Sequence, residues 1–193
     1  MNSVPNQLFA SSSVFPVELN DHDAVKECLR GNKQAFEVIV DRYQKPIYNL
    51  ILRMVRDPED AADLTQTVFV RAYEKLKTFD PRQKFFSWLY RIAINTSLNF
   101  VNQRKHTVRM DHAASYEDMT AHDQYEKAER AEKLGEALMR LRPEYRAIVI
   151  LRHFHDLSYW EIGKILDVPE KTVKSRLFSA RQLLRTFLVR LGL

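Results

Sequence analysis

The sequence predicts an all-α protein: two small helical domains joined by a flexible linker, the second domain containing a helix-turn-helix. The chain of 193 residues has only four glycines, and 45% of its residues are hydrophobic, enough to form cores. Apolar residues recur at spacings of three and four through most of residues 21–105 and 128–193. Between them, residues 106–127 have little apolar periodicity and are rich in Asp, Glu, His, Ser and Thr, which predicts a linker. Residues 1–20, rich in Ser and Asn, predict a flexible N-terminal extension.

The first domain is expected to hold four helices. A short helix ends at a turn at Gly31-Asn32, and a longer one carries apolar residues from Phe36 to Met54, with Pro46 as an expected kink. Asp57-Pro58 marks the start of a third helix, because Asp caps a first turn and Pro fits the first helical position. A break at "FDPRQK" precedes a fourth helix, Phe85 to about Gln103.

Two helices near the C-terminus carry strong start signals. Ser158 and Glu161 form an S-x-x-E capping box, and Leu157 with Ile162 is placed as a hydrophobic staple. Gly163 permits a close approach of the second helix, for which Pro169 suits the first turn.

The second of these helices has two distinct faces. Its expected buried stripe is Val173, Leu177, Ala180, Leu184 and Leu188. Lys171, Lys174, Ser175, Phe178, Gln182 and Arg185 gather on the opposite side, and no Asp or Glu follows Glu170. Such a helix fits a DNA major groove, where Lys, Arg and Ser reach base edges and an apolar ring meets a thymine methyl. The alternative is a helical hairpin with a solvated basic face.

Two stretches of the first domain have candidate binding faces. In "DAADLTQTVFVRAYEKL" the outward set is Asp60, Asp63, Gln66, Thr67, Arg71 and Glu74, which is also compatible with a plain solvated face. "FDPRQKFFSWLYRIAINTSLNFVNQRK" interleaves basic residues with aromatics and Asn, a composition suited to single-stranded nucleic acid. Aromatics that simply form the core are the alternative there.

Taken together, these motifs resemble the extracytoplasmic-function (ECF) sigma factors, the minimal sigma subunits of bacterial RNA polymerase. The resemblance runs from about Asp21 to Leu188, with its elements in the family's order. "AFEVIVDRYQKPIYNL" resembles the start of sigma region 2, and "LRPEYRAIVILRHFHDLSYWEIGKILDVPEKTVKSRLFSARQLL" resembles region 4. The resemblance implies that 21–105 binds core polymerase and the minus-ten promoter element, and that 128–193 binds the minus-thirty-five element.

The resemblance also implies three sets of site residues. Contacts with the polymerase beta-prime clamp helices fall on Asp60, Asp63, Leu64, Gln66 and Phe69. Minus-ten contacts fall on Phe79, Lys84, Phe85, Trp88, Arg91, Asn95, Asn99 and Arg104. Minus-thirty-five contacts fall on Lys171, Thr172, Lys174, Ser175, Arg176, Phe178 and Arg181. This chain has Lys171 where the family usually has Gly, and its loop "DPRQKF" is more basic than in relatives.

The implied partners are core RNA polymerase (beta-prime clamp helices and beta flap), promoter DNA in duplex and single-stranded form, and an anti-sigma factor. No catalysis, cofactor or metal is expected, because no spacing indicates a nucleophile with its base, and His153 and His155 face nearly opposite ways on a helix. With Cys28 as its one cysteine, no signal peptide and no apolar span of membrane length, the chain is expected to be cytoplasmic and bacterial, without membrane insertion.

Two other function classes remain open at this point. A stand-alone helix-turn-helix regulator would bind duplex DNA specifically without polymerase, preferably as a dimer on a palindrome. An anti-regulator that keeps a sigma-like surface as a decoy would bind a partner but never support initiation.

Overall fold

The structure is a computed structural model that describes residues 19–107 and 122–192, with side chains up to Arg104 and from Glu129 onward. The first group of helices is α1 (Asp21–Leu29), α2 (Ala35–Val55), α3 (Pro58–Glu74), the 3-10 turn η1 (Leu76–Thr78) and α4 (Phe85–Thr107). The second group is α5 (His122–Met139), α6 (Pro143–His153), α7 (Tyr159–Leu166) and α8 (Glu170–Arg190). These ranges contain no strand, which confirms the all-α prediction.

Local sequence signals account for the helix starts in the first group. The Asn20 side chain caps α1 by accepting from the Asp23 amide at 3.0 Å. The Asp57 carboxylate accepts from two amides of the first turn of α3, and Pro58 is the first helical residue, as predicted. Gly31 makes the turn between α1 and α2 with a φ of +104°, a backbone conformation that residues with a Cβ rarely adopt. α2 continues through Pro46 to Val55.

The first lobe (α1–α4) has its core where α2, α3 and α4 meet. Ile39, Ile47 and Ile51 of α2 are fully buried there, together with Val68 of α3 and Leu89 of α4. The spacings of eight and four residues between the isoleucines keep them on one face of α2, so the apolar face that the sequence predicted forms the core.

The second lobe (α5–α8) is built around α6. Ala147 to Leu151 form an unbroken buried run, because α5, α7 and α8 all pack against α6. Arg146 in the same helix is only 2% exposed. Its guanidinium donates to the carbonyls of Leu138 (3.0 Å), Met139 (2.9 Å) and Leu141 (3.3 Å), which lie at and just after the end of α5. The buried arginine therefore takes the place of a C-terminal cap for α5.

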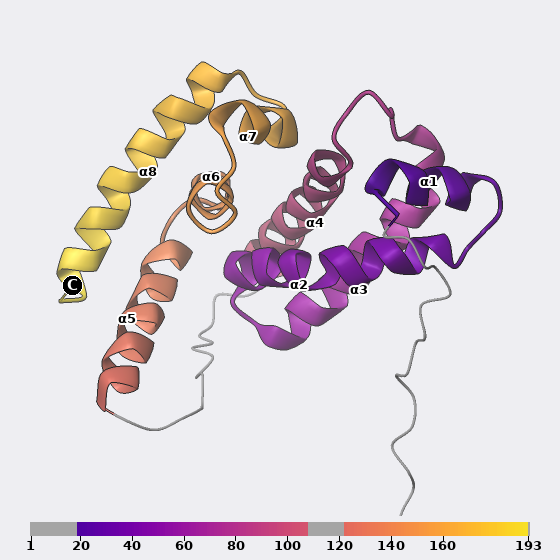
Figure 1. Cartoon of the computed structure of the whole chain (residues 1–193). Helices are drawn as coiled ribbons and strands as arrows, with labels where there is room; N and C mark the ends of the chain where they lie inside the picture. Colours follow the sequence, from indigo (N-terminus) through magenta and orange to yellow (C-terminus); the bar gives the residue numbers. More distant parts are fainter. Residues whose placement is uncertain (1–18, 108–121, 193) are drawn as a thin grey trace, which may run out of the picture.

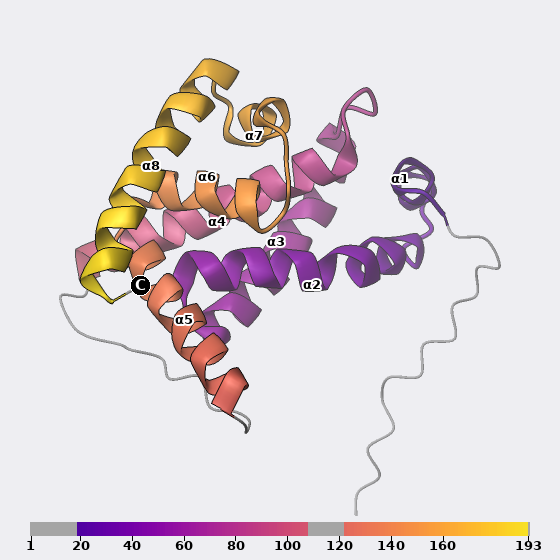
Figure 2. The same cartoon turned by 60° about the vertical axis from the view of Figure 1, so that its left-hand side comes forward.

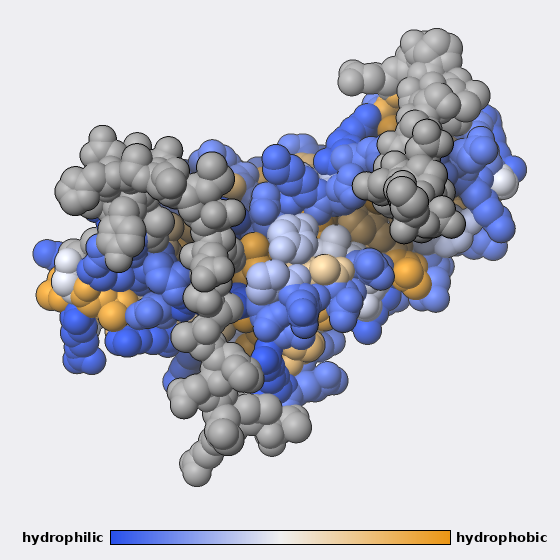
Figure 3. All heavy atoms as spheres, turned by 90° about the horizontal axis from the view of Figure 1, so that it is seen from below, coloured by the Kyte–Doolittle hydropathy of each residue, from blue (hydrophilic) through white to orange (hydrophobic). Residues whose placement is uncertain are grey.

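The two lobes pack against each other (Figures 1 and 2). α4 contacts α6 and α7, and α2 contacts α5 and α6. In both views α7 lies beside α4, with α8 on the outer side of the second lobe. Seen from below, hydrophilic residues cover most of the surface and apolar residues appear only in separate patches (Figure 3).

One helix start differs from the sequence prediction. The helical pattern was expected to resume near Ala128, but α5 begins at His122. Its first turns, "HDQYEK", are almost entirely polar and so lack the apolar stripe that periodicity detects. Residues 108–121 of the predicted linker and residues 1–18 of the predicted N-terminal extension lie outside the described residues.

Candidate nucleic-acid interface

Helix α8 presents the basic face that the sequence predicted. Val173, Leu177 and Ala180 are at most 1% exposed and pack inward. Phe178, on the opposite side, is 66% exposed, although a large apolar ring is normally buried. Pro169 is the cap residue just before α8 rather than part of its first turn, and Glu170 begins the helix.

The remaining predicted residues of α8 lie around this exposed ring. Lys171, Lys174, Ser175 and Arg181 are exposed, whereas Thr172 and Arg176 are half-buried. Lys174 forms an ion pair with Glu170 at 2.7 Å, and Arg181 lies 3.2 Å from the ring of His153. Burial and then the Arg181 charge lower the pKa of His153, so this histidine tends to stay neutral beside the arginine.

The helix before the turn is fixed by the predicted capping box. Ser158 Oγ accepts from the Glu161 amide at 3.2 Å, and the Glu161 carboxylate accepts from the Ser158 amide at 3.0 Å. Gly163 is required by the turn itself, since a Cβ there would lie 2.8 Å from the Val168 carbonyl oxygen. Asp167 ends α7 in the left-handed conformation, at φ +57°.

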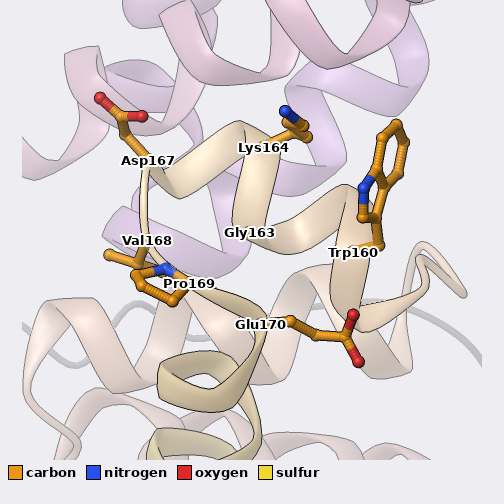
Figure 4. A pocket seen from close by; sticks show the side chains of 7 residues that line it. All are labelled: Trp160, Gly163, Lys164, Asp167, Val168, Pro169 and Glu170. Carbon is orange, nitrogen blue, oxygen red and sulfur yellow. The ribbon is translucent and has the colours of Figure 1, made fainter.

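An exposed tryptophan, which the sequence analysis did not single out, lies beside this turn. Figure 4 shows Trp160 and Lys164 projecting from α7 near Glu170, around a shallow pocket that Gly163 and the turn residues complete. Trp160 is 55% exposed, and the Lys164 ammonium lies 5.6 Å from its ring centroid. Trp160 lies about 200° around α7 from buried Ile162, and a helical projection could therefore have predicted that it faces outward.

In α3 the predicted polymerase-binding residues divide into two groups. Asp63 and Gln66 are exposed, and Asp60 is half-buried and ion-paired with Arg104 of α4. Leu64 (9% exposed) and Phe69 (8%) point into the first lobe. In the described arrangement, therefore, Leu64 and Phe69 hold α3 on its core, and the exposed groups of the set are the Asp63 carboxylate and the Gln66 amide.

The predicted minus-ten residues also divide by burial. Phe79 and Phe85 are buried and, with half-buried Trp88, form a cluster with ring centroids 5.3–5.6 Å apart. Lys84, Asn95 and Asn99 are exposed, and Arg91 is half-buried. The aromatic cluster thus supports the start of α4, while a row of amide and cationic groups follows its surface.

Part of this α4 surface is covered by the second lobe. The Lys84 ammonium forms an ion pair with Glu161 of α7 at 2.9 Å, and Arg91 forms one with Asp167 at 2.9 Å. Arg91 Nε also donates to the Ile165 carbonyl at 3.3 Å. The hydrogen bond from Lys84 is the main reason that the pKa of Glu161 is below its usual range. Two cations predicted to contact DNA are thus engaged by the other domain.

Neither a metal site nor a membrane span is found in the described residues. They contain no group of three or more His, Cys, Asp or Glu placed to hold a metal ion. No helix among them is both long and apolar enough to cross a bilayer. Cys28 is buried in the first lobe, and burial raises the pKa of its thiol to about 11.

Two family models match the chain, and their boundaries follow the two lobes. Sigma-70 region 2 matches residues 39–107, and Sigma-70 region 4 matches residues 131–184. The first segment contains most of α2 and all of α3 and α4, and the second contains the C-terminal half of α5, all of α6 and α7, and most of α8. The predicted polymerase-binding and DNA-binding residues all lie inside these matched regions.

The chain is also similar over most of its length to curated proteins. It is 34% identical to the ECF RNA polymerase sigma factor SigW of Bacillus subtilis, over 83% of this chain and 92% of that protein. It is 35% identical to the RNA polymerase sigma-H factor of Pseudomonas aeruginosa (84% and 90%) and 33% identical to the ECF RNA polymerase sigma-E factor of Escherichia coli K12 (86% and 92%).

Solved structures share the fold. CnrH, in its complex with the cytosolic domain of CnrY, superposes with a TM-score of 0.68 at 22% identity, over 88% of this chain and 97% of that one. The sigma factor RpoE, in complex with the anti-sigma factor NepR from Bartonella quintana, gives a TM-score of 0.66 at 21% identity (79% and 96%). The curated relatives match over at least 90% of their own length, and a family model matches in each lobe. Both findings favour a sigma factor over a stand-alone helix-turn-helix regulator. The chain belongs to the sigma-70 family, as an RNA polymerase sigma factor of the extracytoplasmic-function type.

Proposed function

We propose that residues 21–105 dock on core RNA polymerase and open the minus-ten element, and that residues 128–193 bind the minus-thirty-five element as duplex DNA. The observation that carries this proposal is the exposed basic face of α8 around Phe178, on a chain that matches a sigma factor over 83% of its length. Each domain alone has few base contacts and binds weakly. Docking on polymerase holds the two domains at the distance that separates the two promoter elements. Once one domain has bound its element, the second domain therefore has a higher effective concentration at its own element.

The polymerase contact is assigned to the exposed face of α3. Asp63 and Gln66 project from it. Asp60 contacts the polymerase as well once its ion pair with Arg104 is broken. Leu64 and Phe69 act from beneath by fixing the helix on its core. The clamp helices of the beta-prime subunit are the partner that this acidic and amide surface fits, and the beta flap is the partner of the second domain.

The minus-ten contact is assigned to the loop before α4 and to the exposed side of α4. Asn95 and Asn99 offer amides to the edges of unstacked bases, while Lys84, Arg91 and Arg104 offer cations to phosphates. The aromatic cluster of Phe79, Phe85 and Trp88 shapes the loop that receives a flipped base.

The minus-thirty-five contact is assigned to α8. Its N-terminal half enters the major groove, so that Lys174 and Ser175 reach base edges and Phe178 contacts a thymine methyl. Lys171, Thr172, Arg176 and Arg181 complete the set along phosphates and base edges. Lys171, which replaces the family's usual Gly, adds a cation where the helix begins.

An anti-sigma factor is the proposed inhibitor of this protein. CnrH and RpoE, which share its fold, were both solved with a protein partner, named an anti-sigma factor in the second case. Here the two lobes are already packed together, so an inhibitor would need only to hold the form that engages Lys84 and Arg91. The proposal includes no catalytic activity and no cofactor, and it places the protein with polymerase in the bacterial cytoplasm.

Binding to purified bacterial core RNA polymerase tests the proposal. The wild type is compared with an Asp63→Arg, Gln66→Ala variant, and Asp41→Arg serves as a control because Asp41 is an exposed acid on α2, outside the α3 face. We expect nanomolar binding by the wild type and by the control, and at least tenfold weaker binding by the α3 variant. Absence of core binding, together with specific duplex binding by the protein alone, would overturn the proposal.

A further inference from the structure

The contact between the two lobes contains a half-buried histidine, His155. His155 follows α6 in the second lobe, and its Nδ1 lies 3.1 Å from the hydroxyl of Tyr90 on α4 of the first lobe. The two rings meet edge to face, with centroids 5.2 Å apart and an interplanar angle of 90°. Tyr90 itself is only 7% exposed and His155 is half-buried, so this hydrogen bond is partly shielded from solvent.

The other ring nitrogen of His155 has no partner. Its Nε2 is buried and makes no hydrogen bond to any described residue. A neutral imidazole tolerates this arrangement because Tyr90 satisfies Nδ1, whichever of the two groups donates. An imidazolium does not, because it needs acceptors for two N–H groups and carries a charge that the interface leaves unpaired.

The charged groups around His155 add to this penalty. From α2, Arg53 places its guanidinium 4.4 Å from the ring centroid of neighbouring Phe154, and its positive charge opposes a charge on His155. From α4, the facing group is the neutral phenol of Tyr90, whose pKa burial raises to about 12. The hydrogen bonds and ion pairs of the described residues give His155 no carboxylate partner. Burial and then Arg53 lower its pKa from 6.5 to about 4.

We propose that His155 is a proton-sensitive latch: neutral, it allows the two lobes to pack, and protonated, it drives them apart. The sign follows from linkage. The lobes pack around the neutral ring and the separated form binds the proton more tightly, so packing is complete above pH 6.5 and is lost as pH falls from 6.5 toward 4. With these two values, the ratio of packed to separated molecules falls by about tenfold between pH 7.5 and pH 5.5.

The ion pair between Lys84 and Glu161 across the same interface does not produce the response between pH 7.5 and pH 5.5. Lys84 lowers the pKa of Glu161 below its usual range, so its carboxylate stays charged over that interval. Separation of the lobes releases Lys84 and Arg91 from their ion pairs. That these cations then become available to DNA rests on the proposed function. The latch itself depends on the contacts between the lobes.

NMR titration of the histidine rings in the full-length protein tests the latch, without polymerase or DNA. His155→Gln identifies the His155 signal, because the amide does not titrate. A Lys84→Glu, Arg91→Glu variant places like charges against Glu161 and Asp167, and small-angle X-ray scattering confirms that its lobes have separated. We expect His155 to titrate well below 6.5 in the wild type and to return toward 6.5 in the separated variant.

His153 is the matched control, two residues away. Its ring contacts Arg181, and its pKa is lowered by burial and by arginines of its own lobe, so it should titrate alike in both proteins. A wild-type His155 that titrates near 6.5 would overturn the latch. A His155 pKa that stays equally low in the separated variant would also overturn it, because the cause of the low pKa would then lie within the second lobe.

Discussion

Replacing Arg146 with Met should destabilise the second lobe more than any single surface change. The guanidinium donates to four main-chain carbonyls, those of Leu138, Met139 and Leu141 in the second lobe and that of Met54 at the end of α2. Burial lowers its pKa to about 10, a measure of the cost of holding this cation inside. A net contribution of about 1 kcal/mol per hydrogen bond, partly offset by relief of that cost, gives an expected loss of about 2–4 kcal/mol.

Urea unfolding of the full-length protein, followed by circular dichroism and by tryptophan fluorescence, measures this loss. Each lobe contains one tryptophan, Trp88 in the first and Trp160 in the second, so single-tryptophan versions of the protein (Trp160→Phe or Trp88→Phe) let fluorescence follow each lobe separately. Arg142→Met is the matched control, because Arg142 is exposed and makes no capping hydrogen bond at the start of α6. The control should stay within about 0.5 kcal/mol of the wild type. A loss below about 1 kcal/mol for Arg146→Met would refute the view that this arginine caps α5 from within.

Three further changes follow from the structure. Ser158→Ala removes the side-chain cap of α7 and should cost about 1 kcal/mol in urea unfolding, whereas Ser158→Thr should retain most of it; equal losses would contradict the capping role. Phe178→Ala should change stability by less than about 0.5 kcal/mol, because the ring is 66% exposed, yet weaken holoenzyme binding to duplex promoter DNA by roughly 5- to 30-fold in fluorescence anisotropy. Unchanged DNA binding would remove Phe178 from the interface. Cys28, whose thiol pKa burial raises to about 11, should react with iodoacetamide at pH 8 roughly a hundredfold more slowly in the folded protein than in urea, and similar rates would contradict its burial.

Local signals in the sequence were sufficient for most of the fold. Asp57-Pro58, the Ser158–Glu161 capping box and the spacing of apolar residues in α2 and α8 each predicted an element that the structure contains. These signals act within a few residues, so they can be read without knowledge of the tertiary structure. The start of α5 was missed because its first turns are polar and present no apolar stripe.

Contacts between distant segments could not be predicted in the same way. Nothing local marks Arg146 as buried, since its role depends on carbonyls that α5 and α2 leave at their ends. The pairing of Tyr90 with His155 joins residues 65 positions apart, and no periodicity relates them. Sequence reasoning treated His155 only as half of a weak metal motif, and the structure shows it instead as part of the contact between the lobes.

The candidate site shows the same division. The exposed face of α8 was predictable from helical spacing alone, because the opposite stripe had to be buried. The buried positions of Leu64, Phe69, Phe79 and Phe85 were harder to separate from their proposed binding roles, because an aromatic or aliphatic residue fits either a core or an interface.

Transcription from genomic DNA by core RNA polymerase, with and without this protein, tests the central claim most directly. Purified core is mixed with the wild type or with the Asp63→Arg, Gln66→Ala variant, and the 5′ ends of the transcripts are sequenced. We predict start sites that appear only with the wild type and that share one pair of upstream sequence elements at a fixed spacing. No protein-dependent start sites, from wild-type protein that binds core, would contradict the conclusion that this chain directs promoter recognition.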